Sequence, residues 1–354
     1  MWVLLGHRAG DNGQALTLGR EVAAAVGAVV AAKRLRYTAL HHAPNWLLGT
    51  SLAHLAAGSD PLAPPWPRLV VGVGKRSVPV ARWIRRQSGG VTLLVQIGRP
   101  FAPLGDFDLI VSTPQYGLPA RPNIVANTLP LNRPDPAQLT EAADRWAPRL
   151  APLPRPWTAV LAGGDSVPYR LDAAAGAALA ERAAAATGDG SLLASTSPRT
   201  PPPAATALEE RLRTLLPPER LLLHRWRAGA ENPYPAFLAL ADRFLVTADS
   251  ASMLAEAAST GRPVDVVAPE GARAIARPPG RFWRFLAETG IATPPRDMSR
   301  LQAAVRKAGD ISAIPRDDME RAVARAKDLF LRASLDYMRS ASAGAGALPR
   351  ESAP

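Results

Sequence analysis

One segment of the chain, Phe244–Val264, combines residue types that could bind a diphosphate and a ribose. An apolar run is followed by polar residues that open a predicted helix: Thr247, Asp249, Ser250, Ser252 and Glu256. The first turn of a helix presents unpaired N–H groups and a positive dipole end, and hydroxyl groups add donors. Glu256 falls one turn beyond Ser252, where a carboxylate can accept bonds from two ribose hydroxyls. The plainer alternative is that Asp249 or Ser250 only caps the helix and Glu256 is solvated surface.

Two further strand ends could contribute to the same kind of site. Gly163 and Gly164 follow the apolar run 159–161, and paired glycines allow a ligand or another strand to approach the backbone closely. A second strand end carries hydroxyls and a cation, namely Ser195, Ser197 and Arg199. The hydroxyls could bind an anion that Arg199 clamps. An ordinary Gly-Gly turn and a polar turn are the alternatives.

The N-terminal half offers candidates for acid–base chemistry. Gly6–Gln14 is a glycine-rich loop without the G-x-G-x-x-G spacing of dinucleotide binders or the G-K-[ST] of phosphate-binding NTPases. This argues against an oxidoreductase or an ATPase. His7 and Asp11 are the groups in this loop that could take a proton from a hydroxyl. Alternatively, Asp11 caps a helix and His7 is a solvent-exposed loop residue.

Several classes of site are disfavoured. The chain has no cysteine, which excludes disulfides, thiolate metal sites and a cysteine nucleophile. His41, His42 and His54 have no carboxylate partner at helical spacing, so we expect no metal site and no bound cofactor. A Ser-His-Asp hydrolase is also disfavoured, because the sequence lacks a G-x-S-x-G elbow.

Composition describes a globular protein with an excess of positive charge. Hydrophobic residues make up 47% of the 354 residues, and the formal charge is +12. Either an anionic partner or a GC-rich genome that favours arginine explains this charge. We expect no nucleic-acid partner. The start lacks a signal-peptide pattern, and no apolar run approaches the ~18 residues that span a bilayer. We expect a cytoplasmic protein, with peripheral contact with anionic lipid on the inner membrane face left open.

Short apolar runs alternate with helical stretches along the chain, which is the βαβ pattern. The runs lack polar alternation, as strands buried on both faces of a parallel sheet do. The predicted strands are Trp2–Leu5, Leu69–Val73, Val91–Ile97, Leu109–Val111, Ala159–Leu161, Leu192–Ala194, Leu221–Leu223, Phe244–Val246 and Val264–Val267. Helices are predicted at Gln14–Val26, Val78–Arg86, Ala173–Ala186, Ala251–Ser259 and, near the end, Pro315–Ala341.

The length favours two domains of the α/β class. We predict an N-terminal Rossmann-like domain over 1–133 and a proline-rich linker over 134–156, whose prolines interrupt any long helix. A C-terminal Rossmann-like domain follows over 157–314. A helix over 315–341 packs back on the N-terminal domain, and a disordered tail covers 342–354.

These segments together resemble the bacterial members of the mitochondrial-fission (elongated-mitochondria) protein family, whose members look like glycosyltransferase-B proteins. The motifs that carry the resemblance are Gly6–Gln14, Gly74–Ser77, Gln96–Pro100, Phe107–Val111, Gly163–Asp165, Ser195–Pro201, Asn232–Tyr234 and Val246–Glu256. The chain departs from the pattern at Pro114-Gln115-Tyr116, where relatives carry a proline followed by a His-Asp pair.

The resemblance implies two Rossmann-like domains facing a cleft, with the donor nucleotide on the C-terminal domain and the acceptor on the N-terminal one. It gives Ser250, Ser252 and Glu256 a donor-binding role. The leading hypothesis is a metal-independent glycosyltransferase that moves a sugar from a nucleoside-diphosphate donor to an envelope or lipid-linked acceptor. The cations near Lys75 and Arg99 would meet anionic acceptor groups. A nucleoside-diphosphate-sugar epimerase and a non-catalytic scaffold for membrane-associated partners are the alternatives.

Overall fold

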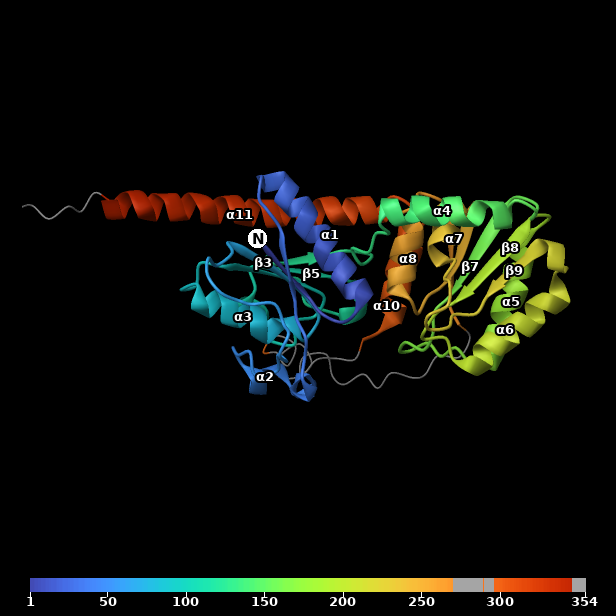
Figure 1. Ribbon diagram of the computed structural model, residues 1–354, viewed down its shortest axis with the longest axis horizontal. Coiled ribbons are helices and arrows are strands. Elements are labelled where there is room, and N and C mark those ends of the chain that lie inside the picture. The colour runs from blue at the N-terminus through green and yellow to red at the C-terminus, as the bar shows by residue number, and fades with distance from the viewer. Residues whose placement is uncertain (270–288, 290–295, 346–354) are drawn as a thin grey trace, which may run out of the picture. The chain divides into compact units, whose positions relative to one another are not determined.

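The computed structural model describes residues 1–269, 289 and 296–345, which fall into two compact units (Figure 1). Unit 1 comprises Met1–Val111, Pro122–Val125 and the chain from Glu320 onward. Unit 2 comprises Ser112–Arg121 and Ala126–Met319. The contacts therefore group 112–121 and 126–133 with the second unit rather than the first.

Unit 1 is built on a six-stranded sheet with the order β2-β1-β3-β4-β5-β6, in which β2, β1, β3, β4 and β5 pair in parallel. Every residue of β1 and β5 is buried, as expected of strands covered on both faces. The elements are β1 (Trp2–Leu5), α1 (Ala9–Val26), β2 (Ala31–Arg34), α2 (Asn45–Leu48), β3 (Leu69–Val73), α3 (Ser77–Gln87), β4 (Leu93–Ile97), β5 (Leu109–Ser112) and β6 (Ile124–Ala126). Short 3-10 turns lie at Ala39–His42, Leu104–Asp106 and Pro114–Tyr116.

Unit 2 is built on a five-stranded parallel sheet with the order β11-β10-β7-β8-β9. Its strands are β7 (Trp157–Ala162), β8 (Ser191–Thr196), β9 (Leu221–His224), β10 (Arg243–Thr247) and β11 (Val264–Val267). Its helices are α4 (Pro136–Leu150), α5 (Ala173–Thr187), α6 (Pro202–Leu215), α7 (Tyr234–Leu240), α8 (Ala251–Ala258) and α10 (Met298–Ala308), and a 3-10 turn spans Pro218–Arg220.

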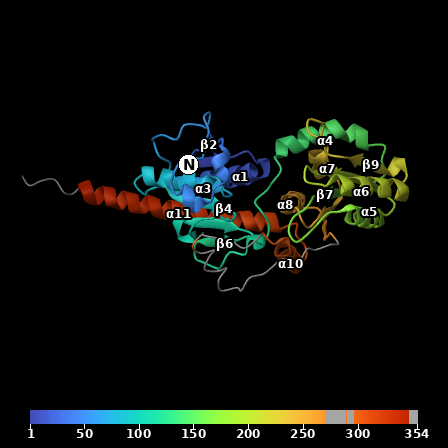
Figure 2. The same ribbon diagram turned by 90° about the horizontal axis from the view of Figure 1, so that it is seen from below.

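Helices cover both faces of the second sheet. Ala159 and Leu161 of β7 pack into a core that includes Leu150 of α4, Phe237 of α7, Leu254 of α8 and Leu301 of α10. The intervening residues, Val160 and Ala162, pack with α5 and α6 through side chains such as Leu179 and Leu208. This alternation follows the period of two along a strand. Figure 2 shows α4 and α5 on opposite sides of these strands. The predicted α/β class with two Rossmann-like domains is confirmed.

Helix α4 corrects one prediction. The stretch 134–156 was expected to contain no long helix, yet Pro136–Leu150 is helical over 15 residues. Pro136 stands in the first turn, where the missing N–H is not needed, and Asp135 caps that turn by accepting from the Ala137 N–H at 3.0 Å. Pro148 falls in the last turn, so its missing hydrogen bond comes near the end of the helix.

Helix α11 (Ile314–Ala345) is the long C-terminal helix, drawn in red in Figure 1. From Glu320 onward it belongs to unit 1, where Ala322 and Ala326 are fully buried. Arg325 Nη2 donates to the carbonyl of Pro122 at 2.5 Å. The predicted packing of this helix on the N-terminal domain is confirmed. The predicted tail begins at 342, but residues 342–345 still belong to α11, and 346–354 lie outside the described residues.

Candidate functional site

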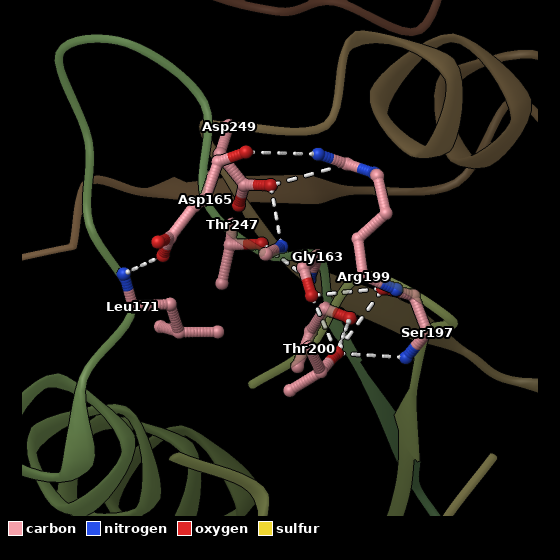
Figure 3. Close-up of polar contacts among 10 residues, drawn as sticks. Gly163, Asp165, Leu171, Ser197, Arg199, Thr200, Thr247 and Asp249 are labelled. Atoms are coloured by element: carbon pink, nitrogen blue, oxygen red, sulfur yellow. Dashed lines mark hydrogen bonds and ion pairs between the residues drawn. The ribbon is translucent and has the colours of Figure 1, made fainter. Parts of the chain in front are cut away.

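The loops that follow β7, β8 and β10 meet at one edge of the second sheet (Figure 3). These three strands are neighbours and run parallel, so their carboxyl ends share that edge. From β7 the chain continues to β8 and β9 on one side, then returns to β10 and β11 on the other side. The reversal between β7 and β10 is a topological switch point, the position where open α/β sheets place their ligands.

Asp249 is at the centre of this edge. Its side chain is fully buried, and Oδ2 accepts from the Gly164 N–H at 2.6 Å and from Arg199 Nη2 at 3.2 Å. Burial raises the pKa of Asp249, while hydrogen bonds from Thr247 and Gly164 and the charge of Arg199 oppose that rise. In the described part of the chain, Oδ1 is buried without a hydrogen-bond partner. Asp249 therefore organises the loops around it.

The two glycines after β7 are required because neighbouring loops approach their Cα atoms too closely for a side chain. A Cβ on Gly163 would lie 2.2 Å from Asp249 Oδ2, and one on Gly164 would lie 2.1 Å from the carbonyl oxygen of Arg199. The Gly163 N–H donates to Thr247 Oγ1 at 2.8 Å. The paired glycines are thus more than an ordinary turn, because they form a junction that joins three strand ends.

The loop after β8 closes the other side of this junction. Ser197 Oγ donates to the Gly163 carbonyl at 2.8 Å, and Thr200 Oγ1 donates to the same carbonyl. Arg199 stands between these hydroxyls in sequence, and Nη1 lies 3.4 Å from the carbonyl oxygen of Asp165. Its side chain is 47% exposed. Arg199 is consequently oriented by buried groups while part of its guanidinium reaches solvent.

Helix α8 begins at Ala251, and neither of the two residues considered as its cap, Asp249 and Ser250, makes a capping bond. Ser250 occupies the N-cap position, but its side chain makes no capping hydrogen bond. Asp249 uses its carboxylate on Gly164 and Arg199 instead. Ser252 lies in the first turn and is partly exposed. The alternative in which these residues only cap the helix is therefore wrong, and the positive end of α8 remains suited to an anion.

Glu256, further along α8, is paired with Tyr234, which was not among the predicted site residues. Tyr234, at the start of α7, donates its hydroxyl to Glu256 Oε2. Burial raises the pKa of Glu256, and the bond from Tyr234 opposes that rise. The pKa of Tyr234 is also raised, by burial and by the neighbouring carboxylate. Glu256 is thus a partly buried, hydrogen-bonded carboxyl group and not solvated surface.

The structure brings together most of the predicted donor-site residues. One polar network joins Gly163, Gly164, Ser197, Arg199, Thr247 and Asp249. Ser195 lies inside β8, where its buried hydroxyl bonds to the carbonyl of Thr196, so it is outside this network. Thr200 and Tyr234 were missed as site residues, although both belong to motifs recognised in the sequence.

The predicted acid–base residues lie in unit 1. His7 is exposed in the loop after β1, and Asp11 is in the first turn of α1, whose N-cap position is Arg8. Arg76 Nη1 lies 2.7 Å from a ring nitrogen of His7. Partial burial lowers the pKa of His7, and Arg76 lowers it further, whereas Asp11 raises it. The pKa shift favours the neutral imidazole, which can accept a proton.

The described residues contain neither a candidate metal site nor a candidate membrane-spanning helix. Nowhere in these ranges do three or more His, Asp or Glu side chains gather in a way that could hold a metal ion. No helix in the same part of the chain combines the length and the apolar character needed to cross a membrane.

Comparison with known proteins identifies the family. A model of the family described as mitochondrial fission ELM1 matches residues 9–325. The chain belongs to this mitochondrial fission ELM1 family. The mitochondrial fission protein ELM1 of Arabidopsis thaliana is 28% identical over 249 residues, which cover 64% of this chain and 56% of the Arabidopsis protein. The chain thus spans a little over half of that family member.

Solved structures with a similar fold are more distant. MurG of Acinetobacter baumannii is 14% identical with a TM-score of 0.39, and the match covers 92% of this chain and 94% of MurG. A UDP-GlcNAc 2-epimerase of Neisseria meningitidis, solved with UDP-GlcNAc, is 9% identical with a TM-score of 0.42, covering 95% and 99%. Membership of the ELM1 family therefore rests on the family model and the Arabidopsis protein.

Proposed function

We propose that unit 2 binds a nucleoside-diphosphate sugar and that the protein transfers the sugar to an acceptor hydroxyl on an envelope or lipid-linked molecule. The observation that carries this proposal is the junction of three strand ends at the switch point, with the uncapped start of α8 beside it. A helix start and a guanidinium both favour an anion, and Arg199 has donors that reach solvent.

In this scheme each group has a separate task. The first turn of α8, with Ser250 and Ser252, binds the diphosphate, and Arg199 stabilises the charge that develops on it as the sugar leaves. Glu256 accepts bonds from the ribose hydroxyls. His7 or Asp11 takes the proton of the acceptor hydroxyl. No metal ion is required in the scheme, so activity should persist in the presence of EDTA.

The test is calorimetric titration of the full chain with UDP, GDP, TDP and CMP. One nucleotide should bind saturably, and Arg199→Gln should weaken its affinity about tenfold or more, because a charge-assisted hydrogen bond is lost. Arg182→Gln is the matched control, since Arg182 is exposed on α5 of the same unit and carries the same charge. No binding of any nucleotide, or equal loss in both variants, would overturn the donor site.

Product analysis then separates transfer from epimerisation, because an epimerase needs no second substrate. Family membership favours one further candidate, a non-catalytic scaffold, since the Arabidopsis relative is named as a fission protein. A folded protein that binds none of the four nucleotides but binds liposomes would favour the scaffold.

A further inference from the structure

Three consecutive backbone carbonyls in unit 1 are each held by a different buried side chain. The carbonyls belong to residues 74–76, the loop between β3 and α3. The donors are Gln96 Nε2 to Gly74 at 3.0 Å, Asn45 Nδ2 to Lys75 at 3.0 Å, and His54 Nε2 to Arg76 at 2.9 Å. These three side chains are 1%, 2% and 0% exposed. Buried polar groups of this kind fix a loop firmly, because each would be costly to leave unpaired.

The fixed loop lies at the topological switch point of the unit 1 sheet. In the order β2-β1-β3, the chain runs outward from β1 to β2 and then returns to β3 on the other side. The loops after β1 and β3 therefore flank the crevice position of this sheet. They are in contact, since Arg76 Nη1 lies 2.7 Å from a ring nitrogen of His7.

These two loops concentrate positive charge. Arg8 follows His7, and Lys75 and Arg76 belong to the fixed loop. Arg76 lowers the pKa of His7 and Lys75, and Arg8 lowers that of Arg76, although burial is the larger cause in each case. Asp11 opposes these effects at His7 and Arg76. The potential between the loops is therefore positive.

Two helix starts point to the same charge preference. Arg8 and Arg76 are the N-cap residues of α1 and α3, which have 18 and 11 residues, and neither side chain makes a capping bond. Helix N-termini carry partial positive charge. A phosphate is compact and carries more than one negative charge. It suits a site that combines a fixed loop, arginine and lysine side chains and two helix starts.

We propose that the loops after β1 and β3 bind a phosphate or diphosphate group, with Lys75 and Arg76 as its principal side-chain ligands. Gln96, Asn45 and His54 are positioning residues, because they hold the loop and are themselves buried. That this group belongs to the acceptor rests on the proposed transferase function, whereas the anion site depends on unit 1 alone.

The experiment is a titration of the full chain with inorganic pyrophosphate at low salt, followed by calorimetry and by NMR of the histidine rings. Binding should raise the pKa of His7, because an anion offsets the neighbouring cations; a His7→Gln sample assigns its signal. Arg76→Gln and Lys75→Gln should each weaken binding about tenfold or more. Arg20→Gln, exposed on α1 of the same unit, removes the same charge and should leave binding unchanged.

Two further arms identify the source of the ligand and the location of the site. Phosphatidylcholine vesicles with and without phosphatidic acid test a lipid phosphate; binding that needs phosphatidic acid and Arg76 supports a lipid source, and binding of pyrophosphate alone supports a soluble one. Arg199→Gln tests unit 2. If Arg199→Gln abolishes pyrophosphate binding and Arg76→Gln does not, the proposal is overturned, as it is if Arg20→Gln has an equal effect or if neither probe binds. Nucleotide titrations report separately on the donor site.

Discussion

Asp249 Oδ2 lies 3.2 Å from Arg199 Nη2, in an ion pair whose carboxylate is fully buried and whose guanidinium side chain is 47% exposed. An arginine that reaches water contributes little stability through such a pair. Its main consequence is orientation, because Asp249 and the carbonyl of Asp165 engage separate nitrogens of the guanidinium while other donors remain directed elsewhere.

Replacing Asp249 tests its organising role. Asp249→Ala should reduce the free energy of unfolding by about 1–3 kcal/mol, because the Gly164 N–H loses its buried acceptor. Asp249→Asn retains an acceptor oxygen and should cost less. Urea unfolding followed by circular dichroism measures both. Equal midpoints for wild type and Asp249→Ala would contradict this role.

Replacing glycine by alanine should be harmful at the junction and favourable at an unhindered helical position. Gly164→Ala places a Cβ against the backbone of Arg199, so the loop after β8 must shift and nucleotide affinity should fall. Gly13→Ala meets nothing within 4 Å and lies inside α1, where alanine is favoured by up to about 1 kcal/mol. Thermal melts compare the stability of the two variants, and calorimetry compares their affinity for whichever of the four nucleotides the wild type binds. A Gly164→Ala protein with unaltered affinity would argue against the junction as part of the site.

Glu256 predicts a dependence of stability on pH. Its pKa in the folded state lies above the ordinary value of 4.5. The contribution of the protonated carboxyl group to the free energy of unfolding is therefore complete below pH 4.5 and is lost as pH rises through the folded-state pKa. Glu256→Gln removes this loss, and the stability of the variant relative to wild type should therefore increase with pH across that window. Urea unfolding at a series of pH values measures the difference. Glu210→Gln, exposed on α6, is the control, and a pH-independent difference for Glu256→Gln would refute the prediction.

Tyr234 and Glu256 should be energetically coupled. Tyr234→Phe removes the donor to the carboxylate and should cost about 0.5–1.5 kcal/mol, while raising the pKa of Glu256 further. A double-mutant cycle with Glu256→Gln isolates the interaction energy of the pair, because the two residues are joined by one hydrogen bond. Strictly additive losses would show that the bond does not contribute to stability.

Replacing Asn45 should reduce stability and pyrophosphate affinity more than replacing an exposed amide of the same unit. Asn45→Ala leaves the carbonyls of Lys75 and Pro100 without their buried donor, at a cost of about 1–3 kcal/mol. Pyrophosphate affinity should fall as well, because the loop 74–76 loosens. Gln87→Ala, exposed at the end of α3, should change neither quantity. Urea unfolding and calorimetry provide the comparison, and a normal Asn45→Ala protein would remove the argument for a fixed loop.

The apolar pattern predicted all five strands of the second sheet and the inner strands of the first, and it missed the two edge strands of the first sheet, β2 and β6. Trp2–Leu5, Leu69–Val73 and Val264–Val267 have the predicted bounds. Strand β2 was missed because it lies at the sheet edge, is mostly exposed and has no apolar run; its pairing with β1 defines it. Helix α4 was missed because its prolines occupy positions that a helix tolerates.

For the site, single loops were predictable and their partners were not. Strand ends rich in Gly, Ser and Asp indicated the loops of unit 2, since parallel strands bring their carboxyl ends to one edge. The pairing of Tyr234 with Glu256 joins residues 22 positions apart, and that of Asn45 with Lys75 joins residues 30 apart. Such pairs depend on how helices and loops pack in three dimensions, which no local spacing encodes.

The division of α11 has a consequence for how the protein is made. Unit 1 contains both the first strand and the chain from Glu320 onward, whereas unit 2 ends at Met319. A ribosome synthesises the N-terminus first, and domains generally fold as units as they emerge. Unit 2 is fully synthesised while unit 1 still lacks the part of α11 that contains the buried residues Ala322 and Ala326. Unit 1 starts before unit 2 and is thus completed after it, and a gene fragment truncated before Glu320 encodes unit 1 without the part of α11 that packs on it.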